Sequence, residues 1–172
     1  MRRNNQQYEY IAVYVDDLAF AMEDPHAFIG ILLGKYKFKI KEARPLSFHL
    51  GADFYREEDG TLCMAPQKYI DRLAANYEKI FGEKPSSKMY LPMERGDHPE
   101  LDDSELLDAT GIQQYQSLIG SLQWAISLGQ FDITTAVMSM LGCCALPRRG
   151  HLKQLQLIWN YLVKMKSATI RF

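Results

Sequence analysis

The chain has 172 residues, 47% of them hydrophobic, and a formal net charge of −1, which suits one ordinary globular domain or two small ones. Apolar runs stay shorter than the roughly 18 residues of a membrane helix, and the polar N-terminus shows no signal peptide, so we expect neither a membrane protein nor a secreted one. Cys63, Cys143 and Cys144 fit no zinc spacing and indicate a reducing compartment. The near-neutral charge counts mildly against a free-standing nucleic-acid binder.

The first predicted elements are two antiparallel strands, at about residues 9–14 and 18–23. Aromatic and β-branched residues before the pair Asp16-Asp17 and an apolar run after it favour this hairpin. The two aspartates suit the tight turn between the strands. Asp24 is then expected to cap a helix.

A strict alternation follows at residues 35–41. It places Lys35, Lys37, Lys39 and Lys41 on one face and Tyr36, Phe38 and Ile40 on the other. The pattern predicts a half-buried strand with a basic outer face.

A second hairpin is predicted around Asp59-Gly60, between residues 47–55 and 61–64. A helix is expected to begin at Pro66 and to end at Gly82. Its expected inward residues are Tyr69, Ile70, Leu73, Tyr77 and Ile80.

Residues 83–109 have the composition of a linker, in which Asp102-Asp103-Ser104-Glu105 could cap a single helical turn. Three amphipathic helices that suggest a small bundle follow. The first is expected to begin at a capping box formed by Thr110 and Gln113, the second at Asp132 as its cap, and the third near His151. Trp124 and Trp159 sit at core spacing, and residues 168–172 begin a strand-like pattern.

The pair Asp16-Asp17 carries the clearest chemistry. Adjacent carboxylates between apolar strands repel each other unless a cation neutralises them, and we expect the site to be partly buried. Hard oxygen ligands suit Mg²⁺, and phosphoryl transfer commonly uses two such ions about 4 Å apart. The competing interpretation is a plain hairpin turn whose acidic residues face water.

An ordered series of motifs is similar to the reverse transcriptases of copia-type LTR retrotransposons. The series comprises Tyr14-Val15-Asp16-Asp17, Phe48-His49-Leu50-Gly51-Ala52-Asp53-Phe54, Gln67-Lys68-Tyr69-Ile70, Tyr115-Gln116-Ser117-Leu118-Ile119-Gly120-Ser121-Leu122 and Phe131-Asp132-Ile133. They resemble, in order, the polymerase signature, the Leu-Gly hairpin of the primer grip, the start of the thumb helix and two later helical segments. Gln116 departs from the arginine usual in the family, and Gly129-Gln130-Phe131 replaces Thr-Arg-Pro.

The resemblance implies an α+β fold with three parts. Residues 1–65 would be a partial palm, 66–109 a thumb-like helix and linker, and 110–172 a connection-like helical region. The activity implied is RNA-directed DNA synthesis in the cytoplasm, inside virus-like particles of the element, with the nucleus as a second location.

The resemblance also implies site residues and partners. Asp16 and Asp17 would bind Mg²⁺, with Mn²⁺ as a substitute, and Tyr14 and Val15 would contact nucleic acid. The partners would be an RNA or DNA primer–template and, in the full-length enzyme, deoxynucleoside triphosphates. We expect the fragment to be inactive alone, because the upstream segment with a third aspartate and the fingers, and the downstream ribonuclease H domain, lie outside this sequence.

Two further sets of residues have alternatives that stay open. Lys37 and Lys39 could contact phosphates, or could keep an edge strand soluble. Leu50 and Gly51 could bring backbone close to a primer terminus, or could form a bulge in a hairpin.

The pattern of the whole chain has two rival functional interpretations. A phosphoacceptor receiver domain is excluded, because it needs a helix directly after the acidic pair and alternating parallel strands. A decayed, non-enzymatic remnant, acting as a nucleic-acid-binding or interaction module, remains an alternative.

Overall fold

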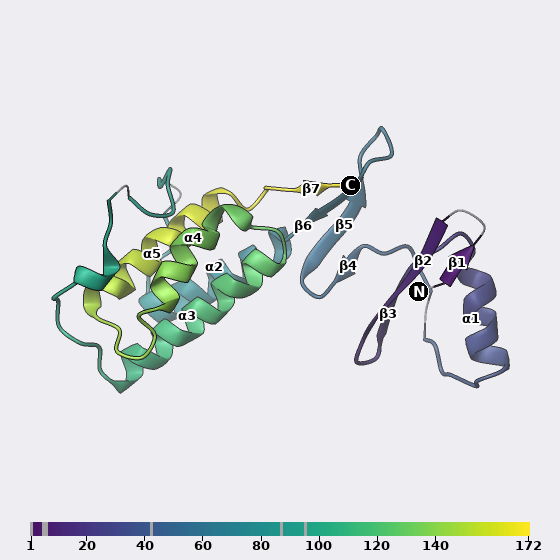
Figure 1. Cartoon of the computed structure of the whole chain (residues 1–172), viewed down its shortest axis with the longest axis horizontal. Helices are drawn as coiled ribbons and strands as arrows, with labels where there is room; N and C mark the ends of the chain where they lie inside the picture. Colours follow the sequence, from purple (N-terminus) through teal and green to yellow (C-terminus); the bar gives the residue numbers. More distant parts are fainter. Residues whose placement is uncertain (1, 5–6, 42, 87, 95) are drawn as a thin grey trace. The chain divides into compact units, whose positions relative to one another are not determined.

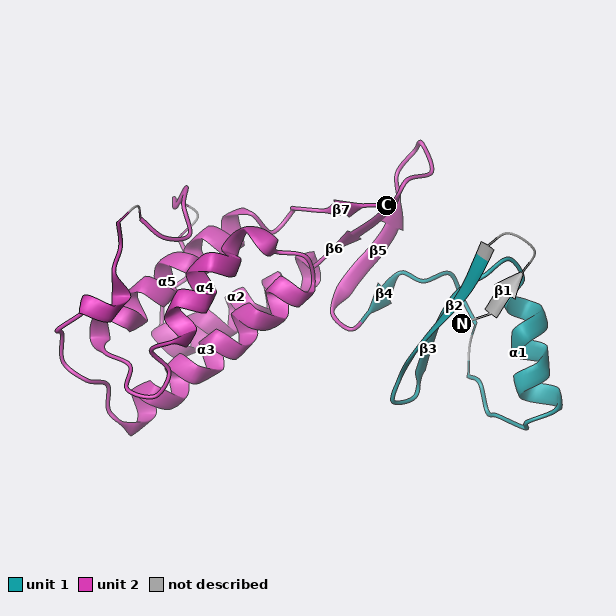
Figure 2. Ribbon diagram, in the orientation of Figure 1, with its two compact units in different colours: residues 1–49 teal, residues 50–172 magenta. Residues whose placement is uncertain are grey.

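The computed structural model describes residues 2–4, 7–41, 43–86, 88–94 and 96–172. The chain forms two compact units, residues 1–49 and 50–172 (Figure 2). Antiparallel strands and helices occur in separate runs, so the α+β prediction is confirmed. Within the described residues, no helix combines the length and the apolar character needed to cross a bilayer.

The first unit is a three-stranded antiparallel sheet followed by a helix. Strands β1 (Arg2–Asn4), β2 (Gln7–Tyr14) and β3 (Asp17–Ala21) lie in that order, as Figure 1 shows. Helix α1 (Pro25–Gly34) begins after Asp24, whose Oδ1 accepts a hydrogen bond from the backbone N–H of Ala27 at 3.0 Å. The predicted hairpin and the predicted cap are therefore both confirmed.

Packing in the first unit is thin. Phe20 of β3 and Phe28 of α1 meet at 5.7 Å between ring centroids, so α1 covers the Phe20 face of the sheet. None of the side chains described between residues 8 and 49 is buried. Few buried apolar contacts leave this unit with little hydrophobic stabilisation of its own.

The prediction of a strand at residues 35–41 is wrong, because this segment has no regular strand structure. The backbone N–H groups of Lys35 and Tyr36 donate to the Ile31 carbonyl at the end of α1. Lys37 then has a φ of 56°, and the Phe38 N–H returns to the Leu32 carbonyl at 3.0 Å. Donors that satisfy a helix C-terminus in this way are not free for a strand ladder.

A short strand, β4 (Phe48–His49), directly precedes the second unit in the chain. That unit contains β5 (Ala52–Arg56), β6 (Leu62–Ala65) and β7 (Ile170–Arg171). Strand β6 pairs antiparallel with both β5 and β7. The predicted hairpin turn is confirmed, since Asp59 Oδ1 accepts from the Thr61 N–H at 2.9 Å and Gly60 has a φ of 87°. The predicted terminal strand is confirmed as β7.

The remaining helices form the main core. They are α2 (Gln67–Phe81), α3 (Ala109–Ser127), α4 (Thr134–Leu141) and α5 (Arg149–Lys164), which pack together in Figure 1. Helix α2 ends at Gly82 in the left-handed conformation, as predicted. Its Ile70, Leu73 and Tyr77 join buried residues of the other three helices.

Several local predictions in this unit were wrong. The cap of α3 is Asp108, whose Oδ1 accepts from the Gly111 N–H at 2.7 Å, and not Thr110. Asp132 does not cap α4, whose N-cap residue is Ile133 without a side-chain cap. The Tyr161 hydroxyl donates a hydrogen bond to Asp132 Oδ2 at 2.8 Å. The single helical turn lies at Pro99–Leu101, before the residues expected to cap it, and its N-cap residue is His98.

Two residues expected in the core are exposed at the surface. Trp124 is 41% exposed and Ile80 is 36% exposed, whereas Trp159 is buried as expected. A repeat of apolar residues on a helix marks a face, but the width of the covered stripe depends on which neighbours pack there.

The end of the linker is fastened to the start of α5 by Asp102, Ser104 and Gly150, which we call the α5 clasp. The Gly150 N–H donates to Ser104 Oγ at 2.8 Å, and Ser104 Oγ donates to Asp102 Oδ1 at 2.5 Å. The Ser104 N–H donates to the same Oδ1 at 3.0 Å. His151, buried beside them, accepts from the Arg148 N–H through Nδ1 and lies 2.8 Å from the Pro99 carbonyl through Nε2.

Candidate metal-binding turn

The aspartate pair lies on a tight hairpin turn between β2 and β3. Tyr14 pairs with Asp17 across the two strands, so Val15 and Asp16 form the connecting loop. Val15 has a φ of 52°. A positive φ at the first loop position is what two-residue hairpin turns need to follow the twist of the strands. The aspartates therefore sit at the end of the sheet and not within a helix.

Val15 occupies a strained backbone conformation. The left-handed region costs a residue with a Cβ roughly 1–2 kcal/mol, and a β-branched residue is an unusual choice there. Its side chain is 86% exposed, so no packing in the described structure offsets that cost. Strain of this kind concentrates at functional sites.

Both carboxylates are exposed to solvent, Asp16 in the loop and Asp17 as the first residue of β3. The expectation that the aspartate pair is partly buried is therefore wrong, because no described side chain between residues 8 and 49 is buried and none covers the two carboxylates. Among the described residues, no group of three or more His, Cys, Asp or Glu side chains could hold a metal ion. The available ligand set is the two adjacent carboxylates.

Tyr14, which precedes the turn, is one of three exposed tyrosines on β2. Tyr8, Tyr10 and Tyr14 alternate along β2 and therefore point to one face of the sheet. Each is about half exposed, at 50%, 54% and 52%. The Phe20 contact places α1 on the opposite face, because Phe20 pairs with Ile11 and not with a tyrosine.

The predicted phosphate-contacting lysines lie after α1 in the same unit. Lys37 and Lys39 are exposed, but they do not share a strand face, since the segment is not a strand. Tyr36 and Phe38, predicted to face inward, are 57% and 59% exposed. A contact with nucleic acid stays a prediction for the two lysines.

Leu50 and Gly51 form a second tight turn, in the other unit. Their φ angles are 53° and 100°. A Cβ at Gly51 would stand 3.2 Å from Leu128 Cδ1 and 3.4 Å from Trp124 Nε1. Glycine at 51 thus has a packing reason, and its predicted role near a primer stays untested. The exposed Trp124 beside it was not identified from sequence, because its spacing matched the core.

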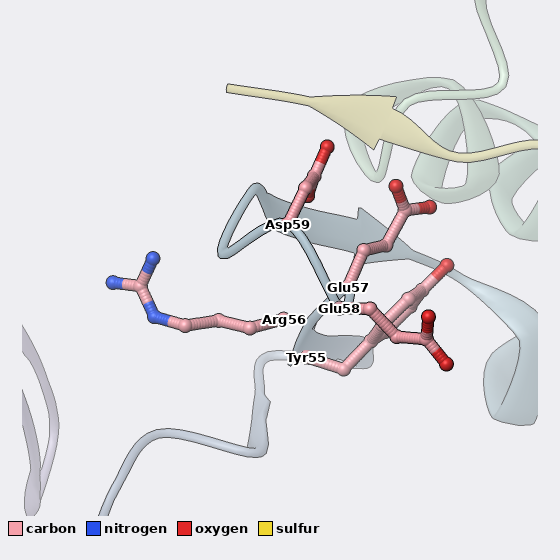
Figure 3. A pocket seen from close by; sticks show the side chains of 5 residues that line it. All are labelled: Tyr55, Arg56, Glu57, Glu58 and Asp59. Carbon is pink, nitrogen blue, oxygen red and sulfur yellow. The ribbon is translucent and has the colours of Figure 1, made fainter.

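A wide hollow at the β5–β6 hairpin offers no candidate site. Its volume is about 520 Å³, and Figure 3 shows Arg56 directed away from Glu57, Glu58 and Asp59. Arg56 donates to the Gly60 carbonyl at 2.7 Å, and Glu57 forms an ion pair with Arg171. These groups stabilise the hairpin and the last strand.

Comparison with known proteins gives one similarity. Over 166 residues, 95% of this chain, the sequence is 25% identical to a Saccharomyces cerevisiae protein named "Putative transposon Ty5-1 protein". The chain spans about half of that relative, 51% of its length. No family model matches the sequence, and no solved structure matches the chain.

Proposed function

We propose that the chain is part of a reverse transcriptase from a copia-type LTR retrotransposon. The observation that carries the proposal is the pair of adjacent carboxylates on a strained hairpin turn between two antiparallel strands. A transposon-related origin is supported by the similarity along 95% of the chain to a protein named as a transposon product. The order of the motifs, from the turn to the last helices, supports the finer assignment.

The chemistry of the turn fits a magnesium ion. Mg²⁺ prefers hard oxygen ligands and keeps several of its waters, so two exposed carboxylates suit its first contact with protein. In the proposed enzyme, two such ions would activate the attacking oxygen and steady the leaving group. We assign the primary ligand role to Asp16 and a second, weaker one to Asp17, and Mn²⁺ would occupy the same position.

The chain alone is proposed to be inactive. Two carboxylates hold Mg²⁺ loosely, because this ion usually relies on bound phosphates as well. Positioning also supplies much of the rate of phosphoryl transfer. A third aspartate and the groups that hold a deoxynucleoside triphosphate would come from the rest of the parent enzyme. The primer–template would be the shared partner of all these parts.

The test is primer extension with an RNA template, a DNA primer, all four deoxynucleotides and Mg²⁺ or Mn²⁺. The chain is assayed alone and fused to the upstream polymerase segment of the same element. We expect activity only in the fusion, abolished by Asp16→Asn and retained by Asp103→Asn, an exposed acid of the second unit. Extension by the chain alone, sensitive to Asp16→Asn, would contradict the proposed need for further ligands.

One observation favours a second candidate, the non-enzymatic remnant or interaction module. No side chain described between residues 8 and 49 is buried, so the unit that carries the aspartates has almost no core. A unit of this kind could persist as a binding module without supporting catalysis. Absence of extension in both proteins, with both folded, would favour this candidate.

A further inference from the structure

Two adjacent cysteines, Cys143 and Cys144, lie in the turn that follows α4. Both thiols are free and both side chains are partly exposed, whereas the third cysteine of the chain, Cys63 on β6, is fully buried. Gly142 before the pair and Ala145 after it are exposed. A small reagent in solution therefore has access to this turn.

Three hydrogen bonds fix the backbone of the cysteine pair. The Cys143 N–H donates to the Met140 carbonyl at 3.1 Å, and the Cys144 N–H donates to the Leu141 carbonyl at 3.2 Å. Gln116 Nε2 of α3 donates to the Cys144 carbonyl at 3.2 Å. Both N–H groups bond three residues back, so the turn is helical, and neighbouring residues of a helical turn do not face each other.

This backbone disfavours a direct bond between the two sulfur atoms. A disulfide needs its Cβ atoms roughly 3.5–4.5 Å apart and pointing toward each other. On a helical turn, neighbouring Cβ atoms point in different directions, so Cys143 and Cys144 could form a disulfide only if the turn lost its hydrogen bonds. An atom placed between the two sulfurs enlarges the ring by one member and removes this demand.

The two thiols lie within electrostatic reach of each other and of one phenol. Burial raises the pKa of Tyr115 first, and Cys143 and Cys144 raise it further. Burial is also the first cause of the raised pKa of each cysteine, followed by Glu100 and Asp102 for Cys143 and by Cys143 for Cys144. Both groups are therefore neutral thiols at neutral pH. Attack on a disulfide needs a thiolate, so exchange at this pair is slow.

The ligand set of the turn is two sulfur atoms. Among the described residues, no group of three or more His, Cys, Asp or Glu side chains could hold a metal ion, so the four ligands of a structural zinc site are not assembled here. Sulfur ligands favour soft centres. Trivalent arsenic that already carries one organic group completes its three bonds with two sulfurs.

We propose that Cys143 and Cys144 together capture a trivalent organoarsenic group, and that the same turn excludes a direct disulfide. With an arsine oxide, R–As=O, each thiol forms one As–S bond, and the two thiol protons leave with the oxygen as water. Arsenic stays trivalent, so the step needs neither an oxidant nor a reductant. The second As–S bond forms within the molecule, at the high effective concentration of a tethered group. This site does not depend on the function of the aspartate turn.

Phenylarsine oxide is the probe, and intact mass measurement of the full chain is the assay. We expect one phenylarsenic group per chain, which excess glutathione, a monothiol, does not remove and 2,3-dimercaptopropanol, a dithiol, does. Cys143→Ser and Cys144→Ser should each lose the glutathione-resistant adduct. Cys63→Ala, at the buried cysteine, should keep it. Urea unfolding of each protein shows that the fold is retained.

Oxidised glutathione tests the second part of the proposal. In the folded chain we expect no Cys143–Cys144 disulfide, whereas the urea-unfolded chain, without the turn, should form it. The capture site is wrong if the folded chain takes up no arsenical, if excess glutathione removes the adduct, or if either serine variant retains it. Ready formation of the disulfide in the folded chain would overturn the geometric argument from the helical turn.

Discussion

Replacing Gly150 by alanine should destabilise the second unit, although alanine is the better helix former. Gly150 lies in the first turn of α5, and a Cβ there would stand 1.7 Å from Asp102 Oδ2. The carboxylate would have to leave the α5 clasp. Its bonds from the Ser104 N–H and Oγ, and the bond from Gly150 to Ser104, would then be lost or weakened.

The expected size follows from these bonds. A hydrogen bond to a charged group is worth about 1.5–3 kcal/mol, and partial solvent exposure of Asp102 brings this toward about 1 kcal/mol. The Gly150–Ser104 bond adds about 0.5–1.5 kcal/mol. Alanine regains about 0.8–1 kcal/mol of helix propensity. The net loss in the free energy of unfolding should be about 1 kcal/mol.

Urea unfolding followed by tryptophan fluorescence measures this loss, because both tryptophans lie in the second unit. The decisive comparison is Gly150→Ala in an Asp102→Ala background, where the clash is gone. There the same substitution should stabilise the protein by up to about 1 kcal/mol, the propensity difference. If Gly150→Ala stabilises the chain with Asp102 present, the close contact does not govern the effect.

Three further outcomes are expected. Gly60 has a φ of 87° in open space, so Gly60→Ala should lower the free energy of unfolding by about 1–2 kcal/mol. Gly129 has a φ of 107° and little free space, so Gly129→Ala should cost more; equal losses in urea unfolding would exclude a packing cost. Hydrogen bonds from Ser104 hold the pKa of Asp102 in the folded protein below its ordinary 3.8. The ionised Asp102 therefore stabilises the fold fully above pH 3.8, and this stabilisation is lost as pH falls through the lower pKa of the folded protein. Asp102→Asn should therefore weaken the fall in urea midpoint between pH 5 and pH 3. Lys37→Glu with Lys39→Glu should weaken binding to a primer–template duplex and reduce its salt slope by roughly 2, and an unchanged slope would make these lysines solubilising only.

Local signals in the sequence were sufficient for several elements. The aspartate turn, the cap at Asp24, the hairpin at Asp59-Gly60 and the end of α2 at Gly82 all matched the structure. Each depends on groups within a few residues of one another, such as a side chain that accepts a nearby N–H or a glycine that allows a positive φ. At these four positions the local residue types were sufficient.

Other features depend on neighbours distant in the chain. Residues 35–41 alternate like a strand, but a strand needs partner donors and acceptors, and the N–H groups here turn back to α1. Trp124 has core spacing but stays 41% exposed, because its helix face is only partly covered.

For the aspartate pair too, the local conformation followed from the sequence, whereas the surroundings depended on the tertiary structure. The sequence by itself determined that Asp16 and Asp17 lie at a turn between two strands, because the residues on either side encode the hairpin locally. Only the tertiary structure decided that both carboxylates are exposed and that, among the described residues, no third ligand joins them. Burial and metal-ligand geometry arise from elements that fold together in space, and no local pattern of residues specifies which elements those are.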